Sequence, residues 1–370
     1  MNFLTEMELE RFFQCDGSRS FILERSVETR DFPALSWGDI SEALDVLKFP
    51  HPDVHLLRGG EKVEHKSLRR AIALLQSGCH LQFAQAQKHI PSLYDFSCKL
   101  RSLLRVPVRF NLYYSPPDDQ LFPRHYDVTD MFIFQIEGRK RWQVFEPKLR
   151  FPLSRHTDNN PDYPEDEVPY IDYVLNAGDV LFVPKGHTHI VSTANSSSLH
   201  ITAAVFFPTA LDYLSLLTAS WPDNEDKRKP ISPWRKNDEK ERLEDILEEL
   251  ENLRDSELHE KLYHHLLNSE EPFELGSFPF CIDTSRQFDL DIECRLIKMP
   301  LIECQKVDTI EVRTPLQIFN LPKSYEHLWE ALKEGWQKFS NLLHMIPDPQ
   351  RAGAEKFLRQ LARLGYIKVR

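Results

Sequence analysis

Short apolar runs with the lengths of β-strands recur through the middle of the chain. They fall at 108–114, 131–136, 140–145, 180–184, 187–192 and 199–207. Segments rich in Gly, Pro, Asp and Asn separate these runs, without intervening helical patterns, and such an arrangement is typical of a jelly-roll barrel. The pair at 131–136 and 140–145 flanks Glu137-Gly138, which predicts a β-hairpin. We therefore predict a mainly β core.

The regions on either side of this core have other patterns. Residues 1–105 are predicted to be mainly helical and to support a barrel that spans 106–220. Residues 221–238 are charged and rich in proline, as expected of a linker. Residues 239–370 begin with an acidic helical pattern, continue with strand-like pieces, and end as helix, turn, helix and short strand. That order resembles a winged helix, so an α+β C-terminal domain is predicted.

Composition narrows the class of protein. The chain has 370 residues, of which 41% are hydrophobic, and its net charge is −11 at neutral pH. These values are typical of a globular enzyme of two or three domains, and the acidity disfavours a large nucleic-acid-binding surface. No apolar run reaches the length of a membrane span. The six cysteines lack zinc-ligand spacing and no signal peptide is recognised, which predicts reduced thiols in a cytoplasmic protein.

Three His-x-Asp motifs are candidates for metal binding. Those at 51–53 and 156–158 lie in polar, turn-like stretches, and we interpret both as exposed turns. His125-Tyr126-Asp127 differs because it lies between two strand-like runs. On an extended backbone its imidazole and carboxylate point to the same face. Two imidazoles and one carboxylate are the ligand set of a mononuclear non-haem Fe(II) site, so a second histidine is required.

A pair of histidines follows the second half of the strand pattern. His187-Thr188-His189 begins a strand-like run directly after the turn Pro184-Lys185-Gly186. Side chains two residues apart on a strand share a face, so His187 and His189 both qualify as the third ligand. Spacing alone leaves the choice between them open.

Several of these motifs, taken in order, resemble a known family. From about Val106 to Phe207 the chain is similar to the JmjC branch of the cupin superfamily, the Fe(II)- and 2-oxoglutarate-dependent oxygenases. The motifs that carry the resemblance are His125-Tyr126-Asp127, Gln135-Ile136-x-Gly138-x-Lys140-Arg141 and Pro184-Lys185-Gly186. The core is also similar to the asparaginyl hydroxylase of hypoxia-inducible factor and to the tRNA wybutosine hydroxylase, and the layout resembles bacterial ribosomal-protein hydroxylases. The resemblance implies a double-stranded β-helix.

The resemblance also implies which residues hold the metal. In the family the second histidine stands three residues after the glycine of Pro-x-Gly. That position is His189 in this sequence, and His187 becomes its neighbour. The implied ligands of Fe(II) are therefore His125, Asp127 and His189.

The co-substrate residues are implied in the same way. Lys140 stands at the family's position for the lysine that binds the distal carboxylate of 2-oxoglutarate, with an exposed edge-strand lysine as the alternative interpretation. A buried lysine without an anionic partner is costly, which favours the binding role. Thr202, His200 and Asn111 are implied as further contacts of the co-substrate. Ala204 departs from the asparagine of some relatives.

The residues and the resemblance together predict an oxygenase that uses Fe(II), 2-oxoglutarate and O2 to hydroxylate a side chain of a peptide or protein. Asn111, Tyr113 and Tyr114 are expected near the barrel mouth, where they would orient the substrate. An RNA-nucleoside hydroxylase is the alternative with the same chemistry, and the acidic charge opposes it. A non-catalytic cupin that acts as a binding module is a further alternative. The helical regions and the C-terminal domain are candidates for homodimerisation, and substrate docking is the alternative role of the C-terminal domain.

Overall fold

The computed structural model of this chain describes most of its length. The described residues are 20–23, 33, 35–47, 51–156, 163–164, 166–219, 225–228, 244, 247–248, 291–299, 301–314 and 317–370. The chain divides into two compact units: residues 1–101 with 106–207, and residues 102–105 with 208–370. Among the described residues no helix is long and apolar enough to cross a membrane.

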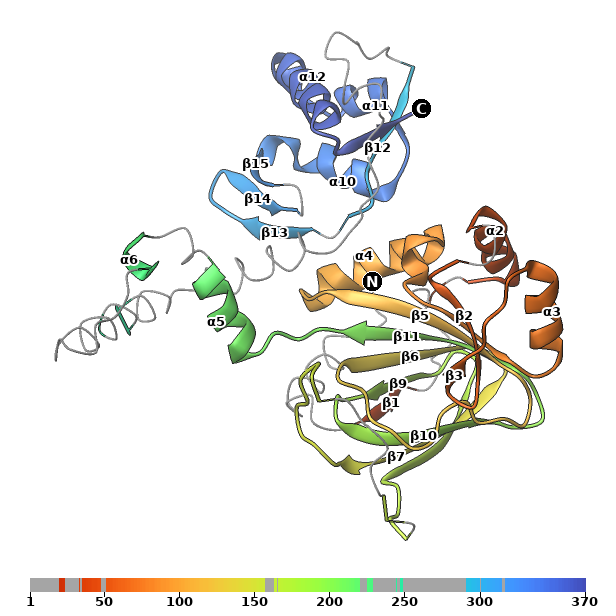
Figure 1. Cartoon of the computed structure of the whole chain (residues 1–370). Coiled ribbons are helices and arrows are strands. Elements are labelled where there is room, and N and C mark those ends of the chain that lie inside the picture. The colour runs from red at the N-terminus through yellow and green to blue at the C-terminus, as the bar shows by residue number, and fades with distance from the viewer. Residues whose placement is uncertain are drawn as a thin grey trace. The chain divides into compact units, whose positions relative to one another are not determined.

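Two antiparallel sheets form the first unit (Figure 1). The larger sheet has eight strands, in the order β1 (Phe21–Leu23), β9 (Val180–Val183), β6 (Asp130–Glu137), β11 (Ser198–Val205), β5 (Val108–Ser115), β4 (His80–Phe83), β2 (Val54–Arg58) and β3 (Glu61–Lys62). The smaller has three, in the order β10 (His187–Thr193), β7 (Arg139–Pro147) and β8 (Ile171–Asn176). The mainly β core predicted from the sequence is confirmed.

Apolar side chains fill the space between the two sheets. One buried cluster joins both of them; its members are Met131, Ile133, Leu181 and Val183 of the large sheet and Trp142, Val144 and Leu175 of the small one. The opposite face of β6 is also buried, because Phe134 contacts Phe96 of helix α4 (Pro91–Leu104) with ring centroids 5.2 Å apart. Burial of both faces explains why β6 is a continuous apolar run instead of an alternating one.

The hairpin predicted across Glu137-Gly138 is wrong. Strand β6 pairs with β9 and β11 in the large sheet, whereas β7 pairs with β8 and β10 in the small one. The turn therefore carries the chain from one sheet to the other. Gly138 has a φ of +68°, and a Cβ there would lie 2.0 Å from the carbonyl oxygen of Ser197. Glycine is required at this crossing for space as well as for conformation.

The N-terminal region contains more sheet than its helical patterns predict. It has helices α2 (Trp37–Leu47), α3 (Leu68–Gln76) and α4, and it also supplies β1 to β4. Strand β4 pairs with β5, with Leu81 opposite Tyr114, and thereby extends the barrel sheet. The β4 segment has only four residues, too few for its alternation to be distinguished from a turn of helix.

The second unit has its own core. Strands β12 (Glu293–Leu296), β16 (Gln337–Lys338) and β17 (Ile367–Val369) form one sheet, and β13 (Ile302–Gln305), β14 (Thr309–Arg313) and β15 (Ile318–Pro322) form another. Among its described residues the helices are α5 (Ala210–Ala219), α6 (Glu225–Arg228), α10 (Glu326–Glu334), α11 (Phe339–His344) and α12 (Asp348–Arg363), with a 3-10 turn, η3 (Lys323–Tyr325). A 3-10 turn of the first unit, η1 (Ala86–Lys88), precedes α4. Trp329 and Tyr366 are fully buried in this core.

Parts of the C-terminal prediction cannot be followed in this structure. The acidic helix predicted at the start of 239–370 and most of the linker 221–238 lie outside the described residues. The helices predicted at 325–339 and 348–364 and the strand predicted at the end of the chain are present as α10, α12 and β17, but α10 ends at Glu334, and the unpredicted elements β16 and α11 follow it. Their assignment as a winged helix, and dimerisation through this domain, stay predictions.

Candidate active site

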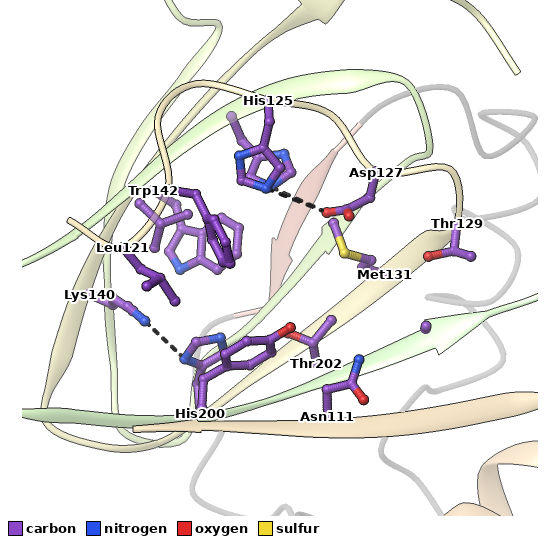
Figure 2. Close-up of a pocket in the computed structure, with 15 residues that line it drawn as sticks. Asn111, Leu121, His125, Asp127, Thr129, Met131, Lys140, Trp142, His200 and Thr202 are labelled. Atoms are coloured by element: carbon purple, nitrogen blue, oxygen red, sulfur yellow. Dashed lines mark hydrogen bonds and ion pairs between the residues drawn. The ribbon is translucent and has the colours of Figure 1, made fainter. Parts of the chain in front are cut away.

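Three side chains converge at one end of a pocket inside the barrel. One donor atom from each of His125, Asp127 and His189 lies within 4.8 Å of the other two. The Asp127 Oδ2 atom is 3.9 Å from Nε2 of His125 and 3.5 Å from Nε2 of His189. Figure 2 shows the imidazole of His125 and the carboxylate of Asp127 turned toward one another. The group has the donor set of a facial metal site with open coordination positions.

The backbone holds the two histidines side by side. His125 lies in the loop before β6, and this loop forms an isolated antiparallel bridge to β10 at His189. The two residues exchange hydrogen bonds: the N–H of His189 donates to the carbonyl of His125 at 2.8 Å, and the N–H of His125 donates back at 3.2 Å. Residues 64 positions apart in the chain (189 minus 125) are thus held as one unit.

Hydrogen bonds to backbone carbonyls orient both imidazoles. Nδ1 of His125 is 2.8 Å from the carbonyl oxygen of Pro123, and Nδ1 of His189 is 3.2 Å from that of His187. A carbonyl only accepts, so each Nδ1 carries the proton and each Nε2 presents a lone pair toward Asp127. Burial lowers the pKa of His189, and the neighbouring His125 lowers it further. The imidazole is therefore neutral, as a metal ligand must be.

The Pro-x-Gly turn positions Asp127. The N–H of Gly186 donates to the carbonyl of Asp127 at 2.9 Å. Gly186 has a φ of +86°, and a Cβ there would lie 2.1 Å from the carbonyl oxygen of Leu149. A glycine is therefore needed for the turn to approach both Leu149 and the His-x-Asp loop.

His187, the rival third ligand, points elsewhere. The expectation that it shares a face with His189 fails because a β-bulge interrupts the pairing of β10 with β7 between these two residues. His187 is buried with its Nδ1 2.7 Å from the hydroxyl of Tyr170, and it lies outside the metal-donor group. Between them, Thr188 accepts hydrogen bonds from Arg124, which anchors the loop that carries His125.

The other end of the pocket contains a buried cation. Lys140 of β7 is 6% exposed; its ammonium donates to the hydroxyl of Ser115 at 2.8 Å and lies 3.2 Å from Nδ1 of His200. Burial lowers the pKa of Lys140 to about 7. Among the described residues no carboxylate lies within ion-pair distance of its ammonium. Figure 2 shows Lys140 and His200 at the end of the pocket away from His125 and Asp127.

A family comparison covers the segment that holds all of these residues. A model described as the JmjC domain matches residues 82–213, which include His125, Asp127, Lys140, His189 and His200. Residues 82–213 are similar to a JmjC domain. The resemblance inferred from the sequence motifs is thereby confirmed.

Named relatives match part of this chain. The chain is 30% identical over 199 residues to the bifunctional lysine-specific demethylase and histidyl-hydroxylase NO66 of Culex quinquefasciatus, an alignment that covers 51% of this chain and 31% of the relative. It is 37% identical over 147 residues to NO66 of Drosophila melanogaster, covering 39% of this chain and 22% of the relative. The chain thus spans less than a third of the length of these relatives.

Solved structures with a similar fold cover nearly all of this chain. The ribosomal oxygenase YcfD of Escherichia coli, in complex with cobalt and 2-oxoglutarate, matches with a TM-score of 0.61 and 14% identity over 98% of both chains. Another structure of YcfD matches with a TM-score of 0.60 and 16% identity over 95% of both. At this identity the likeness concerns the fold, and it agrees with the predicted double-stranded β-helix.

Further polar residues line the JmjC pocket from the large sheet. Asn111 and Tyr113 of β5 pair with Thr202 and His200 of β11, and all four line the pocket, as does Ala204. The rings of Tyr113 and His200 are stacked, with centroids 5.1 Å apart. The predicted co-substrate residues Asn111, Lys140, His200 and Thr202 are therefore brought to one cavity.

Tyr113 and Tyr114, predicted together at the barrel mouth, point to opposite faces of β5. Tyr113 lines the pocket, and burial raises its pKa. Tyr114 instead packs edge-on against Trp37, with ring centroids 6.1 Å apart. Adjacent residues on a strand alternate between faces, so only one of them can reach the site.

A buried chain of hydrogen bonds beneath Lys140 was missed by the sequence reasoning. The hydroxyl of Ser115 lies 3.0 Å from Nδ1 of His80, whose Nε2 lies 3.0 Å from Oδ2 of Asp119. Burial lowers the pKa of His80 and lowers that of His200 further. Both imidazoles are then neutral at neutral pH, and Lys140 is the group of this chain of hydrogen bonds that is positively charged below a pH of about 7. One signal was available: Ser115 continues the period-two face of Asn111 and Tyr113.

Proposed function

We propose that this JmjC domain is an Fe(II)- and 2-oxoglutarate-dependent oxygenase that hydroxylates a side chain of a peptide or protein. One observation carries the proposal. A single pocket is lined by the three-donor group of His125, Asp127 and His189 and, away from it, by Lys140, a buried cation without a described carboxylate partner. A small dicarboxylate that chelates a metal at one end and meets the cation at the other fits this arrangement.

The donor set fits Fe(II). Two neutral imidazoles and a carboxylate supply one negative charge and occupy one side of the ion. Asp127 is about two-fifths exposed and His125 about a quarter, so the pocket side of the group is open to small molecules. The backbone carbonyls that orient each imidazole act as the outer contacts that such sites use to fix the tautomer of their ligands.

The environment of Lys140 fits the distal carboxylate of 2-oxoglutarate. Hydrogen bonds to neutral groups offset only a small part of the free energy that is lost when an ammonium is removed from water. A carboxylate brought into the pocket would neutralise it and accept a charge-assisted hydrogen bond. The hydroxyl of Thr202 and the amide of Asn111 line the same cavity and supply neutral contacts.

When bound, Fe(II) with 2-oxoglutarate and O2 supplies the oxidation: one oxygen atom enters succinate as CO2 leaves, and the other replaces a C–H bond of the substrate with C–OH. The protein positions the reactants. His125, Asp127 and His189 hold the metal at a fixed place, and Lys140 sets the direction of the co-substrate. Leu121, Phe122 and Trp142 give the pocket apolar walls that limit water.

The substrate class follows from the relatives and from charge. NO66 is described as a histidyl-hydroxylase and lysine-specific demethylase, and YcfD as a ribosomal oxygenase. A net charge of −11 favours a basic peptide or protein over a polyanion. We therefore propose a side chain of a basic protein as the target, ahead of tRNA.

Succinate formation tests the proposal. Purified protein with Fe(II), 2-oxoglutarate and ascorbate is expected to release succinate slowly alone and faster with basic peptides from ribosomal proteins. Asp127→Ala is expected to abolish release because it removes the anionic ligand. Acceleration by tRNA alone would replace the protein substrate with RNA. No succinate above the metal-free control would favour a binding module.

A further inference from the structure

A second group of metal-binding side chains lies outside the pocket. His51, Asp53 and His89 each offer one donor atom, and these atoms lie within 4.8 Å of one another. The sequence pattern at 51–53 indicates only a turn, because His89 is far away in sequence and completes the group only in the fold. We infer that this group binds a second divalent transition-metal ion, of the zinc or cobalt class.

The three donors lie in the segments that precede β2 and follow β4, which are paired strands. Asp53 directly precedes β2, whose first residue, Val54, pairs with Phe83 at the end of β4. The N–H of Ala84 donates to the carbonyl of Asp53 at 2.7 Å, which joins the start of one strand to the end of the other. His89 follows the 3-10 turn η1 (Ala86–Lys88). The donors therefore sit on a hydrogen-bonded framework and not on independent loops.

Local contacts orient each ring. His51 is held by a turn in which the N–H of Val54 donates to its carbonyl at 3.0 Å. The His89 ring is stacked on Phe83, with centroids 5.4 Å apart and an interplanar angle of 22°. The two imidazoles meet edge to face with centroids 5.3 Å apart. Both rings are thus fixed beside the same carboxylate before any ion binds.

The separations between donor atoms lie on either side of the value expected around one small ion. Nε2 of His89 is 2.8 Å from Oδ2 of Asp53, and Nδ1 of His51 is 3.9 Å from the same oxygen. Metal–ligand bonds of about 2.0–2.2 Å at tetrahedral angles place donor atoms roughly 3.3 Å apart, between these two values. Nδ1 of His51 accepts the N–H of Asp53 at 3.2 Å, so this nitrogen is unprotonated, and a bound ion would replace that hydrogen bond.

The chemistry of the group selects the class of ion. Two imidazole nitrogens with one carboxylate favour zinc, cobalt, nickel or copper over calcium and magnesium, which prefer all-oxygen sites. The side chains of His51 and Asp53 are 24% exposed and that of His89 is 18% exposed. This leaves room for a water ligand and an entry path. None of the three lines the JmjC pocket, so the ion would join β2 to the η1 turn without entering the reaction.

The alternative to a metal site is a hydrogen-bonded pair of His89 and Asp53 that only stabilises the fold, and such a pair does not require His51. The contact between His89 and Asp53 alone would join the two segments as a neutral or charged hydrogen bond. The additional imidazole of His51, with its acceptor nitrogen beside the same oxygen, is what a metal requires and a pair does not. The two interpretations differ in one measurable property, because only the metal site gains stability from added zinc.

The experiment uses the full chain in which His125→Ala and His189→Ala have removed the barrel site. Zn²⁺ is titrated into the metal-free protein against a chromophoric chelator. This background is expected to bind one equivalent more than the same protein with His89→Ala or His51→Ala. Asp53→Asn keeps an acceptor for His89 and so keeps the fold, and it should weaken the site by roughly tenfold or more. His55→Ala, on the strand that follows Asp53 but outside the group, is the matched control and should bind as the background does.

Thermal unfolding gives a second readout. An ion that binds only the folded chain stabilises it, so Zn²⁺ should raise the Tm of the background and of His55→Ala but not of His89→Ala. Equal zinc stoichiometry and equal affinity in the background, His89→Ala and Asp53→Asn would overturn the proposal. Because the barrel ligands are already absent, this result is independent of whether the JmjC pocket is an oxygenase.

Discussion

The ammonium of Lys140 donates to the hydroxyl of Ser115 at 2.8 Å in the interior of the barrel, where both side chains are buried. A lysine in such a place is stabilised by neutral contacts only, and its charge is available to a ligand. The exposed-edge interpretation of Lys140 does not hold, because Arg139 and Arg141 on either side are the exposed members of β7. Strand alternation separates these three cations into one buried and two exposed groups.

Removing the ammonium should weaken co-substrate binding selectively. Lys140→Ala is expected to raise the Kd for 2-oxoglutarate by roughly 30-fold or more, since truncating one partner of a buried charge pair costs about 2 kcal/mol or more. Metal affinity should change little because no metal donor is altered. Arg139→Ala, next to it but exposed, is the control. Calorimetry under anaerobic conditions measures both constants, and an unchanged Kd in Lys140→Ala would remove this residue from the co-substrate site.

Co-substrate binding should depend on pH through Lys140. Its pKa is lowered to about 7 by burial. Below that pH the ammonium is already charged. Above it the folded protein must take up a proton to bind the dianion of 2-oxoglutarate. The Kd for 2-oxoglutarate should therefore rise by up to about tenfold for each unit by which the pH increases. Lys140→Arg keeps its charge at all these values and should remove the dependence. A wild-type Kd that is flat from acidic to alkaline pH would contradict this account.

The two neighbouring histidines of β10 should differ sharply in metal binding. His189→Ala is expected to lose the barrel metal because its Nε2 faces Asp127. His187→Ala should retain it, since His187 contacts Tyr170 instead. Metal content by elemental analysis after dialysis, with circular dichroism as the check on folding, distinguishes the two. Metal retained in His189→Ala and lost in His187→Ala would reverse the assignment.

The buried chain below Lys140 should matter for stability and for the co-substrate. Ser115→Ala leaves both the ammonium of Lys140 and Nδ1 of His80 without their shared partner. Leaving buried polar groups unsatisfied costs about 1–3 kcal/mol, so the free energy of unfolding should fall by that amount. The Kd for 2-oxoglutarate should rise while metal affinity stays constant. Denaturant unfolding and calorimetry test both, and a variant as stable as wild type would show that the hydrogen bonds contribute little.

Much of the barrel was predictable because its strands are short and bounded by turn residues. The strand-like runs beginning at 108, 180 and 187 correspond to β5, β9 and β10 within two residues. The motif at 125–127 and the pair His187 and His189 were identified because each follows a recognisable turn, and the choice of His189 came from the family resemblance. Strand pairing was harder to predict from the sequence. The turn at Gly138 connects strands of two different sheets, and the sequence pattern around it is the same as that of a hairpin.

The remaining site residues depend on contacts distant in sequence. The bulge between His187 and His189 arises from pairing with β7, so spacing on one strand could not separate these two residues. His80 belongs to β4, in a region whose helical patterns dominate, and its role appears only when β4 pairs with β5. The group of His51, Asp53 and His89 likewise forms only when β2 and β4 lie side by side.

Labelled O2 provides the most direct test of the oxygenase proposal. With Fe(II), 2-oxoglutarate and an accepted basic peptide under ¹⁸O2, mass spectrometry should find one labelled atom in each succinate and one in each hydroxylated peptide. Asp127→Ala should give neither product, because it lacks the anionic metal ligand. Label in succinate with an unmodified peptide would contradict hydroxylation of that substrate. Absence of labelled succinate from wild-type protein, with every substrate and with metal bound, would contradict the oxygenase itself.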